Sequence, residues 1–175
     1  ALLTAREPEK RPLIFKQIDS LSKSSRVAIK TAAVSLLSDI LPTLDENDID
    51  KSVIPIIYTL ANFPDETLLQ EVINCVGSIA RFASSNNVVS TVKDLFTSWG
   101  KDKRIPIRLQ VLRVFTVIVN DVDEQFIDEF ILPQLLQTVN DIQSWSEAGQ
   151  CDQGAMLILH IVHSIESPSE KAKNS

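Results

Sequence analysis

Apolar and polar residues alternate along this chain with the period of an α-helix. In each segment the apolar side chains recur three or four residues apart, which places them on one face of a helix. Breakers such as Pro42 and Gly100 separate the segments, and no segment shows the strict alternation of a β-strand. We therefore predict an all-α protein with about eight helices, over residues 10–21, 25–41, 46–62, 66–82, 87–99, 104–120, 124–139 and 152–165.

The sequence repeats itself, because residues 25–62 resemble residues 103–140. When the first block is placed on the second, nine positions are identical, whereas typical composition would give roughly two or three. A repeat of this length holds two helix pairs of about 39 residues each, and stacked pairs favour a solenoid over a closed bundle. The identical pairs are Arg26 and Arg104, Ile29 and Ile107, Ile40 and Ile118, Asp45 and Asp123, Glu46 and Glu124, Ile49 and Ile127, Asp50 and Asp128, Pro55 and Pro133, and Asn62 and Asn140.

A smaller pattern recurs around the predicted turns. Pro55 lies inside one helix, Asp65 lies in the turn that follows, and Leu69-Gln70 opens the next helix. This arrangement resembles a HEAT repeat, and the resemblance extends over about residues 10–140. The apolar–basic pair is more complete at two other places, Ile29-Lys30 and Ile107-Arg108, the second of them after Asp102.

The resemblance to HEAT and armadillo-type helical repeat proteins implies a right-handed α–α superhelix of four antiparallel helix pairs. Gln70 and Gln134 depart from the pattern, because a basic residue and an apolar residue are expected there. We predict an N-terminal extension, one HEAT-like domain and a polar disordered tail, over residues 1–8, 9–166 and 167–175. The predicted pairs span about residues 10–41, 46–83, 87–120 and 124–166.

Two features concern bending and the chain end. Pro55 and Pro133 occupy matching positions inside helices, so we expect both helices to bend there. The last helix, around residues 155–162, lacks the polar outer face that a terminal repeat needs. We expect this helix edge to continue the array, to self-associate or to dock on a partner. Because the sole Met is Met156, we also expect the chain to be cut from a longer one.

Composition narrows the class of function. There are 17 Lys and Arg residues against 23 Asp and Glu residues, a net charge of −6, which argues against a general binder of nucleic acid or anionic membranes. No apolar run approaches the ~20 residues that a bilayer requires, so we expect no membrane insertion. Cys75 and Cys151 show neither metal-ligand nor disulfide spacing, which favours the reducing cytoplasm or nucleus.

Catalytic groups are scarce. His160 and His163 lie three residues apart, but no Cys or acidic residue stands at a matching position to complete a metal site. Cys75 lies among apolar residues with no base placed to activate it. The four glycines form no phosphate-binding loop. We predict that the protein is not an enzyme and that it holds no metal and no cofactor.

The basic residues follow the repeat, since Arg26 and Lys30 match Arg104 and Arg108. These side chains could form a ridge that binds an acidic or phosphorylated protein segment, or a nucleic-acid backbone. Alternatively, Lys30 and Arg108 could bond turn Asp residues of neighbouring repeats and serve the fold alone. Trp145 lies in the longest stretch between helices, where it is either an exposed interface anchor or folded back over the last pair.

These observations predict a non-catalytic scaffold, a segment of a larger intracellular protein that docks other proteins. The candidate partner-binding residues are Arg26, Lys30, Arg104, Arg108 and Trp145. Binding of a nucleic-acid backbone is the alternative function. The acidic clusters at residues 45–50 and 121–129 stand at predicted helix starts, where capping explains most of them.

Overall fold

The computed structural model describes residues 7–145 and 148–167, without the side chains of Pro8 and Ala148. Every regular element in these residues is a helix. The chain divides into two compact units, residues 1–92 and residues 93–175, with the boundary inside one helix. The predicted extension and the predicted tail lie almost wholly outside the described residues. The extent of the predicted single domain stays a prediction.

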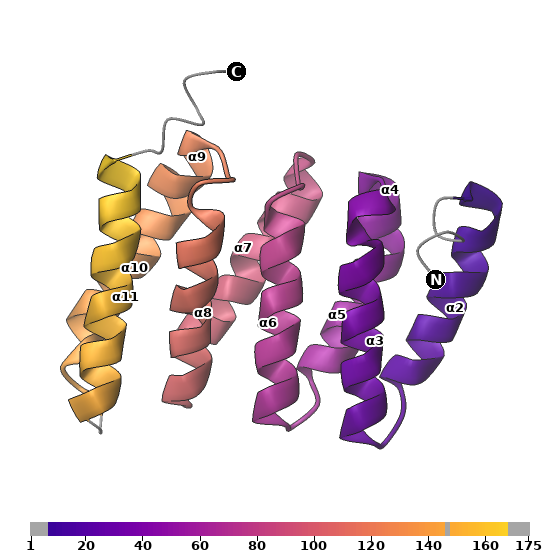
Figure 1. Ribbon diagram of the computed structural model, residues 1–175, viewed down its shortest axis with the longest axis horizontal. Coiled ribbons are helices and arrows are strands. Elements are labelled where there is room, and N and C mark those ends of the chain that lie inside the picture. The colour runs from indigo at the N-terminus through magenta and orange to yellow at the C-terminus, as the bar shows by residue number, and fades with distance from the viewer. Residues whose placement is uncertain (1–6, 146–147, 168–175) are drawn as a thin grey trace. The chain divides into compact units, whose positions relative to one another are not determined.

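The first unit is a two-layered stack of helices (Figure 1). It contains η1 (Pro8–Lys10), α2 (Arg11–Ser22), α3 (Val27–Ile40), η2 (Leu41–Thr43), α4 (Glu46–Asp48), η3 (Ile49–Val53), α5 (Ile54–Ala61), α6 (Glu66–Ala80) and the first part of α7 (Asn86–Gly100). α2 packs on α3 and α5, and α6 packs on α3 and α5, so that α2 and α5 form one layer and α3 and α6 the other. Consecutive helices run antiparallel. Fully buried apolar side chains, including Leu37, Ile57 and Val72, fill the space between the layers.

The second unit shows the same kind of packing. It contains the rest of α7, α8 (Ile105–Ile118), α9 (Glu124–Phe126), η4 (Ile127–Ile131), α10 (Leu132–Ile142) and α11 (Ala148–Glu166). α11 packs on both α8 and α10. An aromatic cluster ties α7 and α8 to η4, because the Phe96 ring lies 5.3 Å from that of Phe115, and Phe115 lies 6.0 Å from Phe130. Trp99 is buried beside Phe96.

Both repeated prolines follow a π-helical segment. η3 and η4 are π-helices of five residues, and Pro55 and Pro133 lie in the first turns of α5 and α10. At each site the residue before the proline donates its backbone N–H to the carbonyl five residues back. A proline ring has no N–H and clashes with the carbonyl four residues back, and the wider turn relieves that clash. The helix geometry therefore changes at the two matching positions that the repeat predicts.

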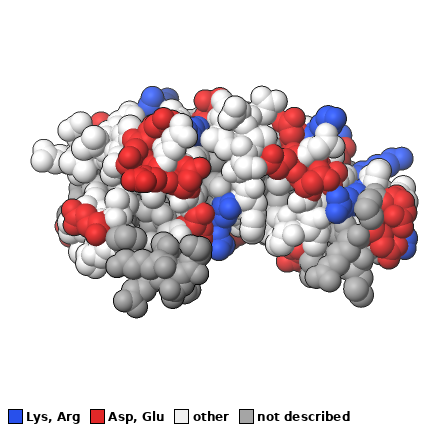
Figure 2. All heavy atoms as spheres, turned by 90° about the horizontal axis from the view of Figure 1, so that it is seen from above, with Lys and Arg blue, Asp and Glu red and all other residues white. Residues whose placement is uncertain are grey.

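The acidic clusters stand at helix starts, as predicted. The Asp45 carboxylate accepts a hydrogen bond from the backbone N–H of Asp48 at 2.9 Å, at the start of α4. Asp123 accepts one from the backbone N–H of Phe126 at 2.6 Å, at the start of α9. Figure 2 views the end at which α4 and α9 begin and shows acidic side chains gathered there in each unit. Capping thus explains the repeated Asp at this position.

The fold class is the one predicted: all-α, with about eight helical rods in the described residues, packed as antiparallel pairs within each unit. Some details differ. The helices predicted over residues 46–62 and 124–139 are each one rod of three segments, and the second of these rods extends to Ile142. The last helix begins at Ala148, one turn before the predicted start at residue 152. Cys151 lies in that added turn, and its thiol donates to the carbonyl of Ile142 at 3.1 Å.

Candidate functional site

Lys30 is an internal residue of the first unit. Only 4% of it is exposed, although it lies on α3 near the helix start. Its ammonium group donates a hydrogen bond to the backbone carbonyl of Ser22 and lies 4.7 Å from the centre of the Phe63 ring. The buried ammonium charge of Lys30 is thus stabilised by a backbone carbonyl and by a cation–π interaction. It is not paired with a turn Asp, which was the partner considered in the sequence analysis. These contacts favour the structural role of Lys30 over the partner-binding role.

Arg108 makes the equivalent contact in the second unit. Its guanidinium donates to the Asp141 carboxylate at 3.1 Å and lies 5.0 Å from the Trp145 ring. Asp141 occupies the position that matches Phe63 in the repeat, so both basic residues reach the same place in their units. Here the partner is an Asp in the last turn of α10, and it is neither of the turn residues, Asp65 and Asp102, that the repeat pattern singled out. The basic side chain therefore joins the end of one helix pair to the end of the next within its unit.

Trp145 folds back over the last helix pair, which is one of the two places expected for it. It is 5% exposed, and its ring lies so close to Gly154 that a Cβ built there would stand 2.8 Å from a ring carbon. Its indole N–H and the Arg108 Nε–H are buried without a hydrogen-bond partner in the described residues. Trp145 thus packs against α11 in this structure. Because residue 154 is a glycine, the indole ring can come close to the helix backbone.

Arg26 and Arg104 occupy matching helix starts but have different surroundings. Arg104 forms a two-point contact with Asp102, from Nε at 3.0 Å and from Nη2 at 2.8 Å. The hydrogen bonds from the Arg104 side chain lower the pKa of Asp102. In the first unit, Ser24 stands at the position of Asp102, and its hydroxyl only accepts a bond from the Arg26 backbone N–H at 3.2 Å. The Arg26 side chain is exposed and meets no acidic group among the described residues.

The five predicted binding residues therefore have different surroundings in the structure. It brings Arg108 and Trp145 together as a packed pair, and it buries Lys30. Arg104 is held by an acidic neighbour, and Arg26 alone combines exposure with a free guanidinium among the described residues. That these residues bind a partner stays a prediction. Spacing in the sequence showed that their positions repeat, but it did not show which side chains the neighbouring turns would cover.

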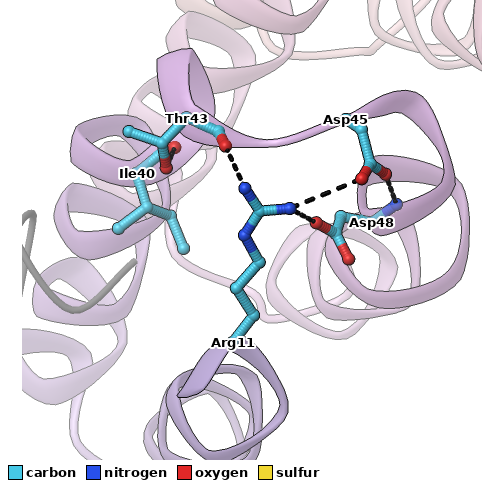
Figure 3. A network of polar contacts seen from close by, with 5 residues as sticks. All are labelled: Arg11, Ile40, Thr43, Asp45 and Asp48. Atoms are coloured by element: carbon cyan, nitrogen blue, oxygen red, sulfur yellow. Dashed lines mark hydrogen bonds and ion pairs between the residues drawn. The ribbon is translucent and has the colours of Figure 1, made fainter. Parts of the chain in front are cut away.

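The sequence analysis missed a polar network at the start of the first unit (Figure 3). Arg11, the first residue of α2, donates to the Asp48 carboxylate at 2.6 Å and to the Thr43 backbone carbonyl at 2.7 Å. It also lies 3.4 Å from an oxygen of Asp45. The network fastens α2 to the start of α4. No repeat signals it, because the position that would match Arg11 in the second half of the chain is Val89.

The candidate catalytic groups lie apart from one another. His160 and His163 are exposed on α11, and the described residues contain no cluster of three or more His, Cys, Asp or Glu side chains able to hold a metal ion. Cys75 is buried in α6, and burial raises the pKa of its thiol to about 11. A thiol with such a pKa stays protonated near neutral pH and is a poor nucleophile.

The most unusual surface of the described residues lies on the last two helices. Large apolar side chains here remain exposed: Met156 by 67% and Leu159 by 64% on α11, with Leu136 and Val139 on α10 exposed by about half or more. Four exposed residues run in one line along α11 at spacings of four, three and four. We call them the α11 stripe, and they are Asp152, Met156, Leu159 and His163.

Comparison with α6 shows what is unusual about α11. Both follow a proline-containing rod, and Val76-Gly-Ser-Ile79 of α6 matches Val162-His-Ser-Ile165 of α11. On this match Ile73 corresponds to Leu159. Ile73 is fully buried, whereas Leu159 is mostly exposed. α11 thus carries an apolar side chain at a position that α6 buries, which makes the α11 stripe the candidate site for contact with another protein.

The chain matches one known family over nearly its whole length. Residues 5–169 match the family described as the RAB11-binding protein RELCH C-terminal domain. The chain belongs to this family. No curated protein matches the chain. Within the described residues, no helix combines the length and the hydropathy needed to cross a bilayer. The family and the all-helical fold agree that this is a helical domain, and the family description names a protein that binds RAB11.

Proposed function

We propose that this chain is a non-catalytic protein-interaction domain and that RAB11 is one of its partners. The main support is that Met156 and Leu159 are exposed on α11. The description of the family names a RAB11-binding protein. Exposed apolar side chains in a charge-poor line are typical of the centre of a protein interface. α11 contains neither Lys nor Arg, which supports a protein partner over a polyanion at this face.

The proposal has three further parts, each supported by other observations. The stacked pairs, the capped helix starts and the repeated prolines support a HEAT-type architecture. The raised pKa of Cys75 and the exposed histidines, which stand apart from any acidic cluster in the described residues, support a role without catalysis. Cys75 and Cys151 are both free thiols, which supports a location in the reducing cytoplasm or nucleus.

The alternative function, binding of nucleic acid, loses part of its support. Nucleic-acid binding would require that the four repeated basic side chains all face solvent. These are Arg26, Lys30, Arg104 and Arg108. Lys30 is buried, Arg108 contacts Asp141 and Trp145, and Arg104 contacts Asp102. A labelled oligonucleotide at about 50 mM salt tests what remains, since backbone binding would be strong there and would weaken steeply as salt rises.

Direct binding to purified RAB11 tests the proposed function. The wild-type chain should bind RAB11 in calorimetry or on an immobilised surface. Arg26→Glu tests the predicted basic contact, with Lys23→Glu as control because Lys23 is already paired with Asp19 at 2.6 Å. We expect Arg26→Glu to weaken binding by several-fold without loss of thermal stability. Absence of RAB11 binding up to about 100 µM, far weaker than ordinary specific complexes, would overturn the RAB11 proposal.

A further inference from the structure

We infer that the α11 stripe pairs with the same stripe of a second copy of this chain, in antiparallel orientation. This inference rests on the proposed function only in that it takes the stripe to be a protein-contact surface. Three observations carry it: the spacing of the exposed residues, their order along α11, and the contrast with the outer surface of α2.

The spacing of the stripe suits a helix–helix seam. Asp152, Met156, Leu159 and His163 stand four, three and four residues apart, and all are exposed. Side chains at this spacing form the seam at which two helices pack side by side. Beside the seam, Ala155 is also exposed, and its small side chain allows a second helix to come close. In α6 the position equivalent to Ala155 is Leu69, which is buried.

The order of the residues favours an antiparallel pair. If two copies of α11 cross at the midpoint between Leu157 and Ile158, Met156 of one copy faces Leu159 of the other. In the same register, Asp152 faces His163, and this happens twice because the pair is symmetric. The apolar residues then meet in the centre and a carboxylate meets an imidazole at each end. A parallel pair would place each residue opposite itself, and the two Asp152 carboxylates would repel.

A head-to-tail contact between copies is less favourable. The outer surface of α2 offers Leu13, which is 66% exposed, but Lys16 and Gln17 are exposed beside it. Burying the Lys16 ammonium against α11 would cost desolvation, and α11 offers it only the carboxylates near its ends. A symmetric contact buries no Lys or Arg from α11, because that helix has none. The symmetric contact is also the commonest kind in homo-oligomers.

Sedimentation equilibrium of the full chain tests the inference. Samples from about 1 µM to about 1 mM cover the range of weak and transient interfaces, and we expect a reversible monomer–dimer equilibrium within it. Leu159→Asp should weaken dimerisation at least about tenfold, because it buries a carboxylate against Met156 of the second copy. Leu13→Asp is the matched control, since Leu13 is a leucine of similar exposure on α2. Circular dichroism checks that both variants remain helical.

A charge exchange tests the register. His163→Asp should weaken the dimer, because it places two carboxylates opposite each other at both ends. The double variant Asp152→His with His163→Asp should restore it, because each end regains one carboxylate and one imidazole. No structural role confined to one copy predicts this rescue.

Several results would overturn the inference. They are a monomer at all concentrations, a dimer that tolerates Leu159→Asp, a dimer lost in Leu13→Asp, and a double variant that fails to rescue. The RAB11 measurement is separate. A monomer that binds RAB11 would refute the pairing and leave the proposed function standing, above all if Leu159→Asp abolishes RAB11 binding. A dimer that does not bind RAB11 would support the pairing and refute the RAB11 proposal.

Discussion

The helices α6 and α11 share the short segment that begins at Val76 and Val162, and each follows a proline-containing rod, yet they differ in how many of their side chains are buried. α6 buries residues on two faces, including Val72 on one and Ile73 on the other. α11 buries Ile158 on the first face but leaves Leu159 on the second exposed. The same pattern of residues is therefore buried on both faces of α6, whereas in the described residues one face of α11 stays exposed.

The largest expected effect comes from shortening matched apolar side chains on these two helices. Ile73→Ala should lower the free energy of unfolding by about 2–5 kcal/mol, because it leaves a cavity in a packed core. Leu159→Ala should change it by less than about 0.5 kcal/mol, because that side chain is mostly exposed. Urea unfolding at low protein concentration measures both. Equal losses from the two variants would show that Leu159 is covered within its own chain, against the comparison.

A second contrast lies at the starts of the two proline-containing rods. In the first unit Asp48 is fastened by Arg11. In the second unit the equivalent position is Phe126, which is buried in the aromatic cluster, with the Lys93 ammonium 5.4 Å from its ring centre. The same rod is therefore anchored by an ion pair in one unit and by aromatic packing in the other.

Removing the ion pair should have an intermediate effect. Arg11→Ala leaves Asp48 and the Thr43 carbonyl without their donor in a partly buried place, so we expect a loss of about 1–3 kcal/mol. Lys23→Ala removes an exposed pair with Asp19 and should cost less than about 1 kcal/mol. Thermal unfolding of both variants decides the matter. If the two losses are alike, the network of Figure 3 contributes no more than a surface pair.

The smallest expected effect concerns the turns before α3 and α8. Asp102→Asn should lower stability by about 0.5–1 kcal/mol at neutral pH, after allowing for solvent screening of the partly exposed Arg104. Hydrogen bonds from Arg104 lower the pKa of Asp102 in the folded state, so its contribution is full above the unfolded value of about 4. It disappears as the pH falls from there through the lowered folded pKa.

Ser24→Ala is the matched control for that pH dependence. Ser24 occupies the equivalent position and accepts a hydrogen bond from the backbone N–H of Arg26 without a charge. Its removal should cost about 0.5–1 kcal/mol, with the same value at pH 7 and pH 3. Stability measured by urea unfolding across this range distinguishes the two turns. A loss in Asp102→Asn that does not shrink at low pH would mean that Arg104 does not depend on the charge of Asp102.

Features of the repeat could be predicted from the sequence where they depend on residues that are close together in the chain. The match of residues 25–62 with 103–140 placed Pro55 and Pro133 at equivalent points, and both follow a π-helical segment. Asp45 and Asp123 cap helices because an Asp side chain at that position reaches a backbone N–H two to three residues on. Such effects extend over a few residues, so they can be inferred from neighbouring residues in the chain.

The candidate sites could be predicted only in part, because burial depends on residues far away in the sequence. Lys30 and Arg26 are one helical turn apart at the start of α3, yet Phe63 covers the first and the second is exposed. Trp145 had two possible places, and Gly154 made room for the buried one. Arg11 gave no signal at all, since its partners belong to a distant part of the chain, around the start of α4.

The helices, their caps, the proline positions and the repeat follow from the order of residues alone, since each depends on contacts within one or two turns of chain. The apolar ending of the last helix was also visible there. Three-dimensional packing was needed to establish which repeated basic residues are internal, that Trp145 packs on Gly154, and that Met156 and Leu159 stay exposed. Whether a side chain is core or surface depends on which helices pack beside it, and a residue pattern does not specify its neighbours.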